Sequence, residues 1–230
     1  MAERRRVPSR RDQLQPIVPL LIGWLVAGVI IAIAGAQRVV PVRMLFLDPQ
    51  ALGDTPWYAG LLSNVGILCW TVSAVAAFGG AWIAARTNRP NAAVFLRGGA
   101  IAASVLLVDD LFLLHSNAMP QLLGTPKLAN IVLVVAPAIV WVITQRDEIQ
   151  RTRTSILWSA FAALGGSVVA DRFVDGPTLG LVVEDGAKLF GIVAWMLYFV
   201  LTSRDIARST IDTAMASRVD RPSAELDASA

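Results

Sequence analysis

Long apolar runs follow one another along the chain and are separated by short polar stretches. A helix of about 20 apolar residues is needed to cross the roughly 30 Å hydrocarbon core of a bilayer. Six runs approach this length, at residues 17–36, 61–85, 98–117, 128–144, 155–170 and 179–201. The pattern predicts an all-α, polytopic integral membrane bundle of six transmembrane helices, which together with their short connections occupy residues 17–203.

The composition agrees with this class of protein. Of the 230 residues, 55% are hydrophobic and 16% are charged, whereas an average soluble domain has about 25% charged residues. The single cysteine, Cys69, excludes an internal disulfide and a metal site built from cysteines. The single histidine, His115, excludes a zinc site with two or three histidine ligands.

The positive residues predict how the bundle is oriented. Most of the 20 Lys and Arg residues lie in four places: the tail 1–16, the second-to-third connection, the fourth-to-fifth connection and the tail 204–230. Positive loops stay in the cytoplasm, so both termini are predicted to be cytoplasmic. The tail 204–230 is rich in Ser, Ala, Asp and Arg and is predicted to be disordered.

The net charge of +3 does not indicate a nucleic-acid partner, because the basic residues lie in loops and tails. The expected partner is the lipid bilayer, together with a second copy of the chain or a subunit of a membrane complex. The abundance of Ala, Arg, Val and Leu points to a GC-rich bacterial genome, and therefore to the plasma (inner) membrane.

Ionisable residues inside three predicted spans are the main candidate for function. Such residues cost about 2.5–3.5 kcal/mol each at a helix centre on insertion scales, and they often mark ion pathways or proton relays. The alternating direction of the spans brings this set into the outer half of the bilayer. The set comprises Asp109, Asp110, His115, Asp171, Glu184, Asp185 and Lys188.

Helical spacing suggests which of these groups form pairs. Glu184 and Asp185 precede Lys188 by four and three residues, so either carboxylate can pair with the lysine on one face of the sixth span. Asp110 and His115 are five residues apart, which places them about 140° apart around a regular helix. They can therefore share a broad cavity but not a narrow stripe.

Three functions fit this cluster. A small transporter, or another protein that handles protons or cations, needs only carboxylates and a titratable base within the membrane. A membrane-embedded enzyme would hold a divalent metal such as Mg²⁺, Mn²⁺ or Fe, although Lys188 competes for the same carboxylates. An accessory subunit of a membrane complex is the third function. A purely structural ion-pair network, in which Lys188 neutralises one or two carboxylates, is the alternative to a functional site. The candidate metal ligands are Asp109, Asp110, His115, Glu184 and Asp185.

The first half of the sixth span resembles the retinal-binding helix of microbial rhodopsins. There a carboxylate precedes the Schiff-base lysine by one turn, as Glu184 precedes Lys188, which Phe190 and Gly191 follow. The resemblance implies retinal on Lys188, but six spans are predicted where that family has seven, and the third span does not follow its pattern. Membrane zinc hydrolases of the ceramidase and progestin-receptor type also have Asp and His residues in their spans, but they need three histidines, and this chain has only His115. We therefore assign no family from the sequence and do not expect retinal.

Overall fold

The computed structural model describes residues 60–173 and 179–219, together with isolated positions among the first 59 residues. The chain divides into two compact units, Met1–Ala59 and Gly60–Ala230, and the second unit contains the long helices of the described residues. Most of the predicted first span, 17–36, lies outside the described residues, and so does the whole basic tail 1–16.

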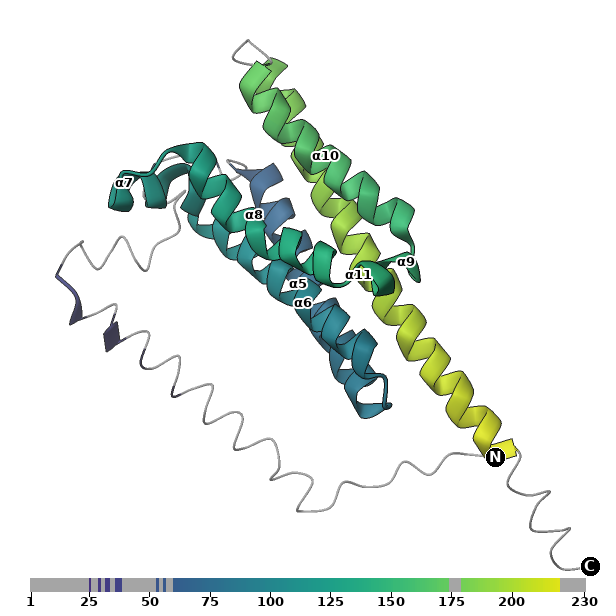
Figure 1. Ribbon diagram of the computed structural model, residues 1–230. Helices are drawn as coiled ribbons and strands as arrows, with labels where there is room; N and C mark the ends of the chain where they lie inside the picture. The colour runs from purple at the N-terminus through teal and green to yellow at the C-terminus, as the bar shows by residue number, and fades with distance from the viewer. Residues whose placement is uncertain are drawn as a thin grey trace, which may run out of the picture. The chain divides into compact units, whose positions relative to one another are not determined.

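The second unit is all-helical over its described residues (Figure 1). A short π-helix, η1, lies between α6 and α7. The elements are α5 (Leu61–Arg86), α6 (Pro90–Phe112), η1 (Leu114–Ala118), α7 (Met119–Leu123), α8 (Lys127–Thr144), α9 (Arg146–Gln150), α10 (Thr154–Phe173) and α11 (Leu179–Val219).

Five of these helices are long and apolar enough to cross a membrane: α5, α6, α8, α10 and the part Val182–Asp212 of α11. They correspond to the second to sixth predicted spans. α6 begins earlier than predicted, because Pro90 provides a favourable first helical residue. α11 continues to Val219, into the segment predicted as a tail.

The outer faces of these helices carry large apolar side chains. Leu68 is 64% exposed, Ile143 is 66% exposed and Phe190 is 76% exposed. Extensive exposed apolar surface of this kind marks a membrane or protein contact. Together with the length of the helices, it indicates a membrane protein.

Aromatic side chains from several helices form the centre of the unit. Trp195, Tyr198 and Phe199 of α11 are fully buried and pack around Trp141 of α8. Helix α11 packs against both α5 and α10, while α6 packs against α5 and α8. Residues of both α8 and α10 border one cavity beside these packed helices.

Close packing between α10 and α11 depends on one glycine. A Cβ atom at Gly191 would lie 2.6 Å from Cγ of Leu164 and 2.9 Å from its backbone nitrogen. Gly186, one turn and a half earlier in α11, has no atom within 4 Å of the same position. The approach of the two helices is therefore closest around Gly191.

Candidate functional site

A cavity of about 420 Å³ lies among α5, α6, η1, α8, α10 and α11. Most of its wall is apolar, with Ile131, Val135, Phe161 and Leu164 among the lining residues. Six of the seven predicted site residues also line it, namely Asp109, Asp110, His115, Asp171, Glu184 and Lys188. The topology therefore brings residues from three predicted spans to one space.

Asp185 is placed differently. It is exposed and borders a separate hollow of about 70 Å³, which it shares with Asp110 and Lys188. The seventh predicted residue therefore lies beside the cluster but outside the main cavity.

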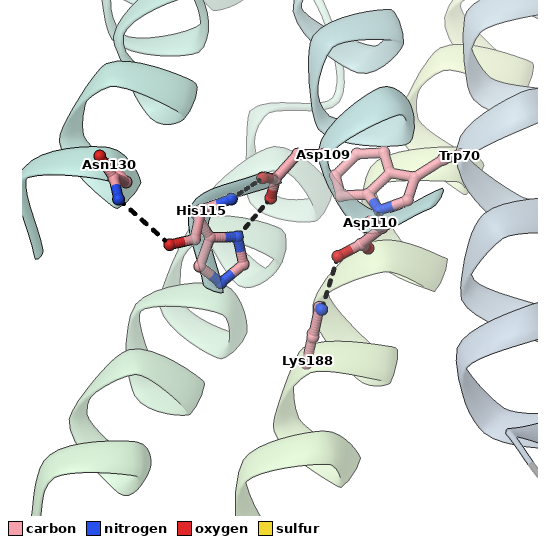
Figure 2. Close-up of polar contacts among 6 residues, drawn as sticks. All are labelled: Trp70, Asp109, Asp110, His115, Asn130 and Lys188. Carbon is pink, nitrogen blue, oxygen red and sulfur yellow. Dashed lines mark hydrogen bonds and ion pairs between the residues drawn. The ribbon is translucent and has the colours of Figure 1, made fainter. Parts of the chain in front are cut away.

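Asp109 and His115, drawn in Figure 2, form the least exposed of the three ion pairs that border the cavity. Asp109 is only 5% exposed. Its Oδ1 accepts a hydrogen bond of 2.8 Å from the His115 backbone N–H, and its Oδ2 lies 2.6 Å from Nδ1 of the same histidine. When Asp109 is ionised, its carboxylate can only accept, and Nδ1 is then the donor of this hydrogen bond. The second ring nitrogen, Nε2, points away from Asp109 (Figure 2).

A local break in the helix makes this pair possible. Asp109 and His115 are six residues apart, and a regular helix would place them about 120° apart around its axis. Helix α6 instead ends at Phe112. The next residue, Leu113, has a left-handed backbone with φ of 50° and ψ of 46°, and the π-helix η1 follows. The change of direction turns the backbone and the ring of His115 back toward Asp109. π-Helical turns are frequent at functional sites.

Asp110 makes different contacts from its neighbour. Its Oδ1 lies 2.6 Å from Nζ of Lys188 on α11, and its Oδ2 accepts a hydrogen bond of 2.8 Å from Nε1 of Trp70 on α5. The carboxylate therefore links three helices. The prediction that Lys188 pairs with Glu184 or Asp185 on its own helix is corrected by this geometry. The Asp110 side chain, which is only 10% exposed, is the partner that Lys188 neutralises.

A third ion pair lies nearer the helix ends. Nζ of Lys127, the first residue of α8, is 2.7 Å from Oδ2 of Asp171 near the end of α10. This pair joins the two helices on either side of the cavity. Both side chains are more exposed than the inner pairs, at 46% for the lysine and 35% for the aspartate. Glu184 lines the same part of the cavity.

Sequence reasoning assigned no site role to three residues that support the cluster. Trp70 donates a hydrogen bond to Asp110, and Lys127 forms the ion pair with Asp171. Asn130, which is 3% exposed, donates a 3.4 Å hydrogen bond to the His115 carbonyl and accepts one of 2.7 Å from Thr125. A polar residue in an otherwise apolar span is the signal that would have pointed to Asn130.

The geometry gives no support to a metal site. Within the described residues, no group of three or more His, Cys, Asp or Glu side chains is arranged to hold a metal ion. The predicted metal ligands instead form separate ion pairs, Asp109 with His115 and Asp110 with Lys188. An ammonium group 2.6 Å from a carboxylate occupies the place that a divalent ion would need.

Comparison with known proteins places the chain in a family. A search of curated proteins finds no match, and a search of solved structures also finds none. A family model described as "Domain of unknown function (DUF8692)" matches residues 21–202. The match covers most of the chain and every residue that lines the cavity. The chain therefore belongs to the DUF8692 family.

Proposed function

We propose that this protein is a small membrane transporter that moves protons, or a cation in exchange for protons, through the cavity between α8 and α10. One observation carries the proposal. Two consecutive carboxylates, Asp109 and Asp110, each have their own basic partner beside one cavity within the spanning segments. Ionisable groups at such positions commonly form proton relays and ion pathways.

The Asp109–His115 pair provides a proton-accepting atom. The carboxylate holds Nδ1 protonated and fixes the orientation of the ring, which leaves Nε2 to take up or release a proton. A protonated His115 would remain beside the negative charge of Asp109. The proton can therefore enter the membrane interior without leaving an isolated charge there, and an isolated charge is the costly state.

The Asp110–Lys188 pair provides a connection that protonation can break. While Asp110 is ionised, it holds Lys188 and thereby links α6 to α11. A proton on Asp110 removes this attraction, since a neutral carboxyl group no longer balances the ammonium. The two helices are then free to change their spacing. Proton movement is coupled in this way to a change in the cavity.

The predicted orientation places the site in the outer half of a bacterial plasma membrane. The arginine-rich connection between α8 and α10 lies at the opposite end of the helices from Lys127, Asp171 and Glu184. If that connection is cytoplasmic, as the positive-inside rule predicts, the cavity opens toward the outer side.

Proton flux into liposomes tests the proposal. The purified protein would be reconstituted with a pH-sensitive dye inside, and an outward potassium gradient with valinomycin would drive protons inward. We expect Asp109→Asn and Lys188→Met to abolish the protein-dependent flux. Asp147→Asn is the matched control, because Asp147 is an exposed residue of the α8–α10 connection. Equal flux in all four proteins would exclude the proposed role of the cluster.

A further inference from the structure

We infer that the cavity binds an amphipathic organic cation, with its charged group beside Glu184 and its apolar chain directed toward Trp195. This inference rests on the proposed function and names the class of substrate that would be exchanged for protons. It is carried by the shape of the cavity, by the order of polar and apolar residues along it and by its balance of charge.

The cavity is elongated along the helices. On α8 its lining extends from Lys127 to Ile139, and on α11 from Glu184 to Trp195. At 1.5 Å per residue these distances correspond to about 18 Å and about 16 Å. The volume of about 420 Å³ is within the usual range for small-molecule sites, roughly 300–1,000 Å³. A long, narrow ligand fits these dimensions.

Polar and apolar residues occupy different ends of this space. Lys127, Asp171 and Glu184 lie at one end, because α8 and α11 begin there and α10 ends there. Ile139, Phe161 and Trp195 lie at the other end. A ligand with one polar head and one apolar tail matches this order.

The charged groups favour a cation. Three carboxylates on the wall, Asp109, Asp110 and Asp171, lie 2.6–2.7 Å from a basic nitrogen. Glu184 is half-buried and interacts electrostatically with Lys127 and Lys188, but it makes no hydrogen bond and no ion pair within 4 Å in the described part of the chain. One carboxylate on the wall is therefore available to a ligand, and a positive head group complements it.

The apolar end of the cavity is lined by aromatic side chains. Phe161 and Trp195 lie there with their ring centroids 5.3 Å apart. Phe161 is partly exposed, so its ring presents aromatic surface to an apolar tail.

Calorimetric titration with decyltrimethylammonium tests this inference, with decyl sulfate as a probe of the same chain length and opposite charge. The full-length protein would be held in lipid nanodiscs, and empty nanodiscs would provide the blank. We expect saturable binding of one decyltrimethylammonium per protein and at least about tenfold weaker binding of decyl sulfate, a difference of about 1.4 kcal/mol.

Two pairs of variants locate the binding. Glu184→Gln should weaken decyltrimethylammonium binding about tenfold, whereas Asp185→Asn, which changes the neighbouring carboxylate outside the cavity, should have less than a twofold effect. Gly165→Leu should abolish binding by filling the cavity. Gly166→Leu is its control, because Gly166 does not line the cavity and both glycines have no atom within 4 Å of an added Cβ.

Several results would overturn the inference. Equal or tighter binding of decyl sulfate would assign the cavity to an anionic amphiphile, and binding no stronger than in empty nanodiscs would assign it to bilayer lipid. Binding unchanged by Gly165→Leu would place the probe elsewhere. Proton flux into liposomes is measured separately and without decyltrimethylammonium. Proton flux in a protein that does not bind decyltrimethylammonium would therefore refute only the cation site. Binding with no flux refutes only the proposed transport.

Discussion

Replacing Lys188 by Met tests the ion pair that joins α6 to α11. The substitution removes the ammonium from Asp110 but keeps an unbranched apolar stem of similar length. Asp110 is then left with a side chain that is 10% exposed and with one remaining hydrogen bond, from Trp70. The expected result is a loss of stability caused by an uncompensated charge within the membrane-spanning part of the protein.

The size of this loss of stability follows from how far the Asp110–Lys188 pair is buried. Removing one partner from a fully buried ion pair costs about 3–5 kcal/mol. Lys188 is 37% exposed, so water already solvates part of the pair, and the Trp70 hydrogen bond continues to stabilise the carboxylate. We therefore expect Lys188→Met to cost about 2 kcal/mol. Asp110→Asn should cost about 1 kcal/mol, since it leaves the more exposed partner behind.

A double-mutant cycle separates the pair from its surroundings. The variant with both substitutions should be more stable than the sum of the single effects predicts, by about 1 kcal/mol or more. Unfolding in mixed micelles by sodium dodecyl sulfate, followed by tryptophan fluorescence, provides the four free energies. The more exposed pair Lys127–Asp171 is the matched control, and its coupling should be below about 1 kcal/mol. Additive effects at Lys188 and Asp110, within about 0.3 kcal/mol, would show that the two side chains are not coupled.

Two further substitutions test the packing and the helix break, both by thermal unfolding with a thiol-reactive dye that reports on Cys69, the single cysteine. Gly191→Ala should lower the free energy of unfolding by about 1–3 kcal/mol, because the added Cβ meets backbone of α10. Gly186→Ala should be neutral or stabilising. Equal stability of the two variants would contradict the close approach of α10 and α11 at Gly191. Leu113→Gly should stabilise the protein by up to about 1 kcal/mol, since glycine adopts the left-handed conformation without strain. A clear loss of stability there would show that the Leu113 side chain contributes more than its conformation costs.

Helix positions were largely predictable from the sequence, and the reason is physical. An unbroken apolar run of membrane length has few alternatives to a spanning helix, which explains the agreement for α5, α8 and α10. The members of the cluster were identifiable for a related reason. Ionisable residues such as Asp110 and Lys188 are costly inside apolar spans, so their presence there is informative by itself.

The pairing within the cluster was not predictable. The contact between Asp109 and His115 depends on the left-handed conformation of Leu113, and leucine gives no sequence signal for that conformation. The contact between Lys188 and Asp110 depends on how α6 and α11 pack. The spacing along α11 predicted that Lys188 pairs with a carboxylate on its own helix. In the structure it pairs with Asp110 of α6, whose carboxylate is largely buried.

Nitrogen-15 NMR of His115 tests whether Asp109 and His115 form a proton-exchanging pair beside the cavity. The chain has a single histidine, so ¹⁵N-histidine labelling in lipid bilayers gives one pair of ring signals without ambiguity. We predict a protonated, hydrogen-bonded Nδ1 and an Nε2 that gains and loses a proton reversibly as the external pH changes. Asp109→Asn should remove the Nδ1 hydrogen bond. A ring whose signals are unaffected by both pH and Asp109→Asn would contradict the proposed proton relay.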